Sequence, residues 1–231
     1  MNLGDKLAAL ASTMSDAERA NYKLLLGMAA GGLVRGGLPP ETGAAAQAFT
    51  AATYSISRLQ PHRDRVARNG IIFRGKPSFV TDELLSALRR ESTELRSAAI
   101  RFDDHYVARG GPIASEVAVS TELEDVLSRY TQHITPTGRA NYLYYDRPGL
   151  GIDPHVDNEE FSLNVVMMLE HVHRENPSAL VLYPGDAPMQ RIFLSPGEII
   201  ALYADSVTHA RERMATDERV SIVAFGFQPI S

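Results

Sequence analysis

Two histidines and one aspartate have the types and spacing to bind a metal ion together. His155 and Asp157 are separated by one residue, and His209 follows far downstream. In an extended strand alternate side chains point to the same side, so His155 and Asp157 would face one point and His209 would reach it from another element. Three such ligands on one face of a metal leave its other positions open. A loop histidine hydrogen-bonded to a nearby aspartate would give the same tripeptide, so the surrounding sequence has to decide.

An arginine near the C-terminus is a candidate for binding a carboxylate. Arg219 opens the tripeptide Arg219-Val220-Ser221, and the apolar run 222–227 that follows predicts a buried strand. An unpaired charge at the head of such a strand is costly, so Arg219 needs a partner. A small dicarboxylate would accept two parallel hydrogen bonds from the guanidinium, and Ser221 would face the same side. The alternative partner is Asp217 or Glu218 at the strand entrance.

These residues, in this order, resemble the pattern of the Fe(II)/2-oxoglutarate-dependent oxygenase superfamily, in particular its prolyl-hydroxylase-like branch. That pattern is His-x-Asp, a distal His and then a basic residue, here His155, Asp157, His209 and Arg219. Tyr145, shortly before the first His, also has a counterpart in that branch. The segments 178–184 and 196–203 resemble the family's strands before the distal His, so the resemblance covers the C-terminal part of the chain.

The resemblance implies a set of ligands and a reaction. Fe(II) would be bound by the three metal ligands, 2-oxoglutarate would chelate it, and O2 would take the last position. Arg219 would hold the far carboxylate of 2-oxoglutarate with help from Tyr145 and Ser221. Some relatives place a tyrosine near Met168, and here Asn164 is either its replacement or a satisfied buried amide. The expected reaction is hydroxylation, or another oxidation, of an unactivated C–H of a small molecule, with release of succinate and CO2.

Other functions fit parts of the same pattern. A protein or peptide side-chain hydroxylase would use the same centre. A cupin-like metal-binding protein would share the fold and the histidines without needing Arg219 or Tyr145, and a catalytically silent jelly roll would serve as an interaction protein. The compact chain has no obvious peptide-binding appendage, which favours a small-molecule substrate.

The expected fold class is mostly β with flanking helices. A double-stranded β-helix (jelly roll, cupin-like) core would form a domain over residues 67–231, with an N-terminal helical extension over residues 1–66. In the extension, Ser15 and Glu18 form a capping box that starts one helix, and a second helix is expected over 41–59, after a Gly/Pro loop at 36–40. This extension could pack on the barrel, cover the site or form a homodimer contact.

Within residues 67–231 the order of elements is expected to be as follows. A short strand at 70–73 precedes a helix from about 82 to 99, and a second helix runs from Thr121 to about 133. Residues 101–120 are expected to be irregular, with a turn at 110–112. From about 139 onward short strands alternate with turns, as in a jelly roll. His171 and His173 are expected in a solvated loop between strands.

Composition excludes several classes of function. The chain has 231 residues, 44% of them hydrophobic, a net charge of −5 and no cysteine. The acidic balance gives no reason to expect nucleic acid or an anionic membrane surface as partner. The absence of cysteine excludes disulfides, thiolate metal sites and cysteine nucleophiles. No signal peptide or transmembrane run is visible, so a cytoplasmic location is expected.

Overall fold

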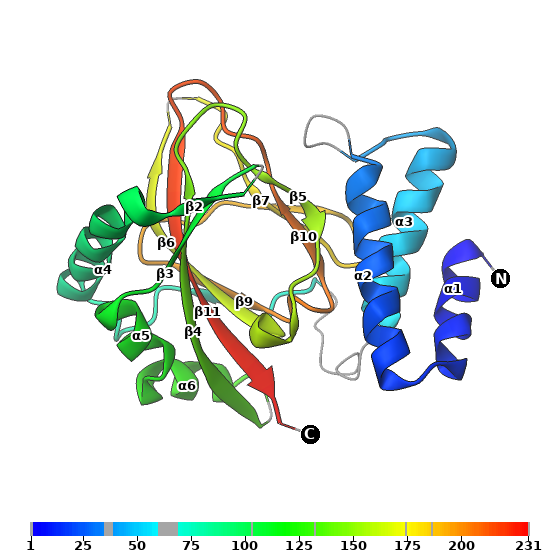
Figure 1. Ribbon diagram of the computed structural model, residues 1–231, viewed down its shortest axis with the longest axis horizontal. Helices are drawn as coiled ribbons and strands as arrows, with labels where there is room; N and C mark the ends of the chain where they lie inside the picture. Colours follow the sequence, from blue (N-terminus) through cyan, green and yellow to red (C-terminus); the bar gives the residue numbers. More distant parts are fainter. Residues whose placement is uncertain are drawn as a thin grey trace.

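Two antiparallel sheets face each other at the centre of the computed structural model, and helices cover the outer side of each (Figure 1). The structure describes residues 2–34, 39–59, 69–102, 104–131, 133–173, 175–185 and 187–230. All strand pairings in this described part are antiparallel. This arrangement confirms the expected fold class, a jelly-roll core with flanking helices.

The larger sheet has seven strands in the order β1-β9-β6-β11-β4-β3-β2. In chain order these are β1 Phe73–Gly75, β2 Ile100–Arg101, β3 Tyr106–Arg109, β4 Ile134–Tyr145, β6 Leu163–Val172, β9 Ile199–Leu202 and β11 Arg219–Pro229. The smaller sheet has four strands in the order β5-β10-β7-β8. Its strands are β5 Ile152–His155, β7 Leu180–Tyr183, β8 Gln190–Ile192 and β10 Thr208–Arg211.

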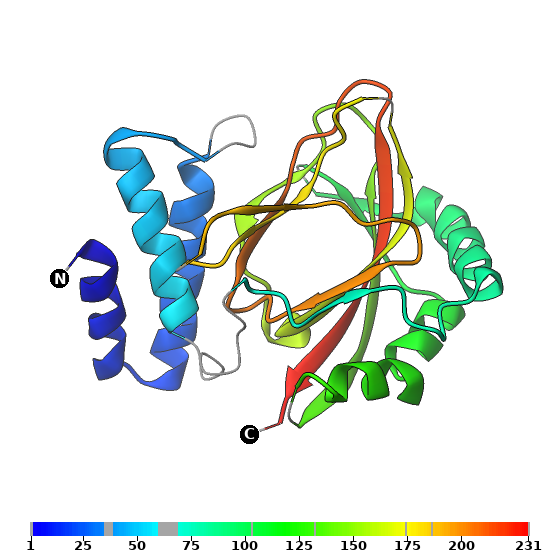
Figure 2. The same cartoon turned by 180° about the vertical axis from the view of Figure 1, so that it is seen from behind.

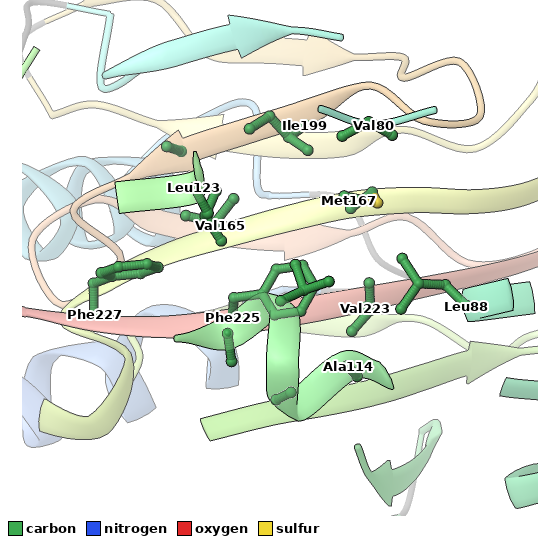
Figure 3. Close-up of a cluster of buried hydrophobic side chains, with 14 of the residues drawn as sticks. Val80, Leu88, Ala114, Leu123, Val165, Met167, Ile199, Val223, Phe225 and Phe227 are labelled. Atoms are coloured by element: carbon green, nitrogen blue, oxygen red, sulfur yellow. The ribbon is translucent and has the colours of Figure 1, made fainter. Parts of the chain in front are cut away.

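The outer face of the larger sheet is covered by three helices, α4 Asp82–Leu95, α5 Pro112–Ala118 and α6 Thr121–Ser128. Leu88 of α4, Ala114 of α5 and Leu123 of α6 are fully buried against Val223 and Phe225 of β11 (Figure 3). Because the facing sheet buries the other side, β11 is apolar on both faces, and its sequence shows no alternation between polar and apolar residues.

The N-terminal helices pack on the smaller sheet. They are α1 Leu3–Leu10, α2 Asp16–Gly32 and α3 Gly43–Arg58, and Figure 2 shows them on the side of the barrel opposite α4–α6. Ile56 of α3 is fully buried in a cluster that includes Val181 and Ala210 of the smaller sheet. The rings of Phe49 and Tyr183 meet edge to face with centroids 5.0 Å apart. Of the three roles expected for this region, packing on the barrel is observed, α2 also lines a cavity beside Asp157, and a homodimer contact stays a prediction.

Several local predictions are confirmed. Ser15 and Glu18 form the capping box that starts α2, and α3 lies within the range expected for the second helix. The helix expected from residue 82 is α4, with Thr81 as its N-cap. The helix expected from Thr121 is α6, although its cap is Ser120. The start of the Gly/Pro loop and the boundary between residues 66 and 67 lie outside the described residues.

The prediction that residues 101–120 are irregular is wrong, because this segment contains β3 and α5. Pro112, taken as part of a turn, is at the start of α5, where proline's missing N–H costs nothing. The cap of α5 comes from another helix. The carboxylate of Glu91 in α4 accepts hydrogen bonds from the backbone N–H groups of Ile113 at 2.7 Å and Ala114 at 3.0 Å. A distant cap of this kind leaves no mark in the local sequence.

None of the helices in the described part of the chain combines the length and the apolar character that a membrane crossing requires.

Candidate active site

The structure brings His155, Asp157 and His209 together. His155 ends β5, and His209 in β10 is its direct register partner. The Nε2 atoms of His155 and His209 lie 3.4 Å and 3.6 Å from Oδ1 of Asp157. Ligands at about 2.1 Å from one metal and at right angles to each other are about 3 Å apart, so these separations suit a shared ion. Of the described residues, these three are the ones whose ligand atoms cluster closely enough for a metal.

Both histidines are oriented by backbone carbonyls. Nδ1 of His155 lies 2.9 Å from the carbonyl oxygen of Asp153, and Nδ1 of His209 lies 2.9 Å from that of Val207. A carbonyl oxygen only accepts, so each Nδ1 carries the proton and each Nε2 keeps a free lone pair. Histidines that bind metals are usually held in this way. The donor set therefore fits a divalent metal such as Fe(II).

Asn164 supports the carboxylate ligand. Its Nδ2 donates to Oδ2 of Asp157 at 2.7 Å, which leaves Oδ1 facing the two histidines. Its own Oδ1 is buried and has no hydrogen-bond partner among the described residues. Asn164 thus lies at the site, where its contact is with the carboxylate ligand Asp157, and a contact with the co-substrate stays a prediction.

The charges of the centre are coupled. Burial alone would raise the pKa of Asp157, but His209 and His155 hold that pKa well below its ordinary range. Burial works to lower the pKa of His155, and the hydrogen bond and attraction to Asp157 outweigh it and raise that pKa. A carboxylate that stays ionised next to two imidazoles is ready to bind a cation.

A cavity between the two sheets opens onto the three ligands. It is lined by apolar side chains, among them Val166, Met168 and Ile222, together with a few polar ones. Tyr145, placed there as expected, is 2% exposed, and burial raises its pKa. A larger hollow lies between α1 and α3, far from the metal ligands, and its lining includes no acidic or basic side chain.

Arg219 and Ser221 do not line this cavity. Arg219 forms an ion pair with Glu170 at 3.2 Å, and its side chain is 57% exposed. The residues of β11 that line the cavity are Ile222 and Ala224, so the odd-numbered side chains at the start of the strand face the other way. Ser221 is opposite Tyr144 in the register. The Tyr144 hydroxyl donates a hydrogen bond to the backbone carbonyl of Ser92 in α4, on the outer face of the sheet. The expectation that Arg219 and Ser221 face the co-substrate is therefore not met.

The arginine inside the cavity is Arg211, which the sequence analysis missed. It is in β10, two residues after His209, and is only 7% exposed. Nη2 donates to the carbonyl oxygen of Ser178 at 3.1 Å and to its hydroxyl at 2.9 Å. Nε is buried with no hydrogen-bond partner among the described residues. The signal was available, because alternate side chains of a strand point to the same side and Arg211 follows His209 by two residues in β10.

His171 and His173 also differ from expectation. His171 is on β6, and its side chain is 7% exposed. Its Nε2–H donates a hydrogen bond to the carboxylate of Glu218 at 2.7 Å. The prediction that both lie in a solvated loop is therefore wrong for His171.

A second cavity adjoins Asp157. Its lining includes Lys23 and Leu24 of α2, Ser162 and Asp205. The Lys23 ammonium is 3.7 Å from a carboxylate oxygen of Asp205, and burial lowers the pKa of Lys23. The N-terminal region thus supplies one wall of a space next to the metal ligands.

Comparison with solved structures identifies proteins of the same fold. SnoN, a non-heme α-ketoglutarate-dependent epimerase from nogalamycin biosynthesis, superposes with a TM-score of 0.60 at 14% identity, over 72% of this chain and 80% of that one. A Pseudomonas putida prolyl-4-hydroxylase superposes with a TM-score of 0.54 at 14% identity, over 78% of this chain and 100% of that one.

HygX from Streptomyces hygroscopicus, solved with nickel, 2-oxoglutarate and hygromycin B, has a TM-score of 0.54 at 13% identity, over 70% of this chain and 84% of that one. Identities this low establish the shared fold alone. No family model and no curated protein sequence matches the chain.

Proposed function

We propose that this chain is an Fe(II)- and 2-oxoglutarate-dependent oxygenase. The observation that carries the proposal is the cluster of His155, Asp157 and His209, whose ligand atoms lie within 4.8 Å of one another at the wall of a mostly apolar cavity. Two imidazoles and one carboxylate form the facial triad of non-haem Fe(II) oxygenases, and they leave positions for a chelating co-substrate and O2. The fold, shared with a prolyl-4-hydroxylase and with HygX, supports the same proposal.

The co-substrate would be held by Arg211 in place of Arg219. With its keto acid end at the metal, 2-oxoglutarate would have its far carboxylate in the same cavity, which Arg211 lines as a buried cation. The unpartnered Nε would offer that carboxylate a charge-assisted hydrogen bond in a buried site. Tyr145 shares the lining, and the guanidinium of Arg211 lies 6.0 Å from the centre of its ring. In this arrangement Tyr145 would still contact the co-substrate, whereas Asn164 holds the carboxylate ligand Asp157.

The residues of the chain position the reactants and exclude water. Asn164 fixes the orientation of Asp157, the two backbone carbonyls fix the imidazoles, and Val166, Met168 and Ile222 keep the cavity apolar. When bound, iron and 2-oxoglutarate supply the oxidation: one atom of O2 enters succinate as CO2 is lost, and the other enters a C–H bond of the substrate. The carboxylate ligand Asp157 favours hydroxylation, since related halogenases lack that ligand to admit chloride.

The substrate would be a small molecule bound in the second cavity. That cavity is lined by Asp157 but not by Arg211, and part of its wall is α2. Lys23 and Asp205 supply polar contacts within it. A mass-spectrometric screen of metabolite mixtures with the iron-loaded protein would identify a substrate as a species gaining one oxygen atom. A Lys23→Ala variant should lower the rate for that species and leave 2-oxoglutarate binding unchanged.

The test of the proposed function is succinate formation from 2-oxoglutarate in the presence of Fe(II) and O2. The parent protein should form succinate, and His209→Ala, which removes one of the three ligands, should form none. A parent that binds iron but neither binds nor consumes 2-oxoglutarate would favour a cupin-like metal protein. A parent that binds no iron would favour a silent jelly roll.

The test of the co-substrate site compares two arginines. Truncating one partner of a buried charge pair costs about 2–5 kcal/mol, so Arg211→Met should weaken anaerobic 2-oxoglutarate binding by about 30-fold or more. Arg219→Gln removes an equal charge from the surface and should change binding less than about twofold. The reverse ranking would restore Arg219 as the anchor.

A further inference from the structure

Three arginines, Arg191 of β8, Arg211 of β10 and Arg219 of β11, differ in how their guanidinium groups are used. Arg191 donates through Nε and Nη2 to Glu212, both at 2.7 Å. Arg219 donates through Nε and Nη2 to Glu170, both at 3.2 Å. In Arg211 one edge is held by Ser178, and Nε is left without a partner among the described residues. A protein carboxylate thus accepts two hydrogen bonds from Arg191 and from Arg219, whereas Nε of Arg211 has no such partner.

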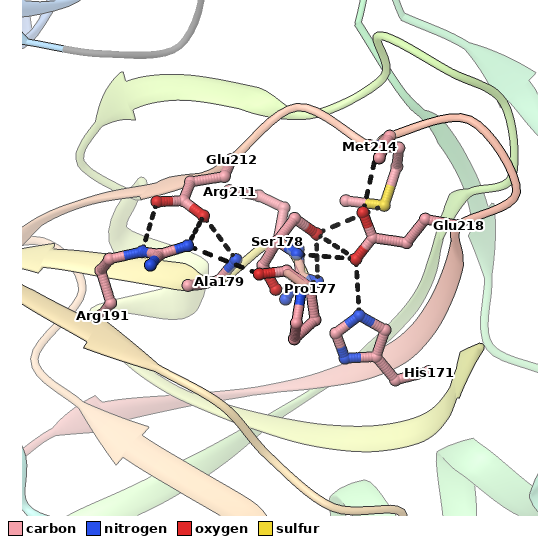
Figure 4. Close-up of polar contacts among 10 residues, drawn as sticks. His171, Pro177, Ser178, Ala179, Arg191, Arg211, Glu212, Met214 and Glu218 are labelled. Carbon is pink, nitrogen blue, oxygen red and sulfur yellow. Dashed lines mark hydrogen bonds and ion pairs between the residues drawn. The ribbon is translucent and has the colours of Figure 1, made fainter. Parts of the chain in front are cut away.

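The carboxylate of Glu218 is nevertheless connected to Arg211 through the side chain of Ser178. The hydroxyl of Ser178 donates to Oε1 of Glu218 at 2.7 Å, and the backbone N–H of Ser178 donates to the same oxygen at 2.8 Å (Figure 4). A serine hydroxyl has one proton and two lone pairs, so it can donate to Glu218 and accept from Arg211 together. The hydrogen bonds therefore run in one direction, from Arg211 Nη2 to Ser178 Oγ and from Ser178 to Glu218.

Glu218 is itself held firmly. Its side chain is 3% exposed, and Oε2 accepts the backbone N–H of Ala215 at 3.0 Å. The Nε2–H of His171 donates to Oε1 at 2.7 Å. With Ser178, these donors satisfy a buried carboxylate without any direct contact to the guanidinium of Arg211.

We propose that Ser178 and Glu218 are positioning residues for Arg211. Glu218 offsets the charge of the buried guanidinium, and Ser178 fixes the position of its Nη2. Because the serine lies between them, Glu218 does not bind the guanidinium directly, and Nε stays available for a carboxylate in the cavity. Without the serine hydroxyl, Glu218 would form a direct ion pair with Arg211, as Glu212 does with Arg191. The role rests on the proposed function, because the ligand that it prepares for is the far carboxylate of 2-oxoglutarate.

The experiment is a double-mutant cycle on binding. Parent, Ser178→Ala, Arg211→Met and the double variant are loaded with Ni(II), which does not turn over, and titrated with 2-oxoglutarate by calorimetry. Ser178→Ala removes one hydroxyl and leaves Glu218 the backbone N–H and His171, so the fold should survive. Loss of a hydrogen bond to a charged group predicts about tenfold weaker 2-oxoglutarate binding. Ni(II) affinity should not change in any variant.

The cycle separates positioning from general stability. If Ser178 acts through Arg211, Ser178→Ala should weaken binding in the parent and have no further effect in Arg211→Met. Equal weakening in both backgrounds, or no weakening in the parent, would overturn the positioning role and leave the proposed function intact. A metal-loaded parent that binds no 2-oxoglutarate would overturn the proposed function and the positioning role with it. Arg219→Gln, which opens a surface pair of similar chemistry, is the matched control and should bind like the parent.

Discussion

At the scale of single residues, the site depends on side chains that hold other side chains. Asn164 is the clearest case, because its side-chain amide nitrogen donates to the carboxylate ligand Asp157 at 2.7 Å. Removing an outer partner of a metal ligand typically costs about 10–100-fold in metal affinity. Asn164→Ala should therefore weaken Fe(II) binding in that range, measured by anaerobic competition with a chelating dye. Affinity equal to that of the parent would show that Asp157 needs no support from Asn164.

Glu218 predicts a pH dependence of stability. Its hydrogen bonds with His171 and Ser178 outweigh the effect of burial and lower its pKa from 4.5 to about 2. A carboxyl whose pKa is lower in the folded state stabilises that state above the unfolded pKa and stops doing so as pH falls through the folded one. Glu218→Gln should therefore lower the free energy of unfolding by about 3 kcal/mol at pH 7.

The difference between Glu218→Gln and the parent should shrink as pH falls from about 4.5 toward 2. Urea denaturation at a series of pH values measures it. Glu170→Gln, which alters an exposed ion pair, should give a curve parallel to that of the parent. A Glu218→Gln curve that is also parallel would contradict the lowered pKa.

At the scale of elements, α2 lies close to the strand that carries the first metal ligand. A Cβ on Gly31 would be 3.0 Å from the carbonyl oxygen of Pro154, whereas a Cβ on Gly32 would meet nothing within 4 Å. Gly31→Val should force α2 away from β5 and cost about 1–3 kcal/mol of stability. Gly32→Val makes the same change in helix propensity without the clash, so it is the control.

The same pair of variants tests whether α2 supports the metal site. Displacing Pro154 moves its neighbour His155, so Gly31→Val should also weaken metal binding, and Gly32→Val should not. Thermal melts and metal titrations of both variants provide the two readouts. Equal behaviour of the two variants would mean that α2 can move without disturbing β5.

At the scale of the whole molecule, the N-terminal helices and the barrel should unfold together. Phe49 and Ile56 of α3 share a buried cluster with Val181, Tyr183 and Ala210 of the smaller sheet, so neither part can separate without exposing apolar surface. Hydrogen exchange at increasing urea should show α3 and β10 losing protection at the same concentration. Loss of protection in α3 at lower urea would indicate an independent extension of the kind expected from the sequence.

What the sequence by itself determined is what short-range periodicity and local chemistry encode. The one-residue spacing brings together His155, at the end of β5, and Asp157, just after that strand. The Ser15 box starts α2, and the apolar runs of the C-terminal part predict the strands of a jelly roll. Tyr145 lines the cavity, and its contact with the co-substrate, expected from the resemblance, stays a prediction. Each of these depends on residues that are close together in the chain or on a pattern shared with known proteins.

Only the tertiary structure decided which face of a strand is directed to the interior and which groups far apart in the sequence come into contact. The β5–β10 register sets His209 opposite His155, and Glu91 caps α5 from another helix. Helices cover the outer face of β11 and the second sheet covers its inner face, so both faces are apolar and the sequence cannot show that Arg219 points out. Arg211, two residues after His209 in β10, faces the cavity and is its buried cation. The local sequence shows that the two side chains share a side, and the packing of the two sheets decides that this side is the interior.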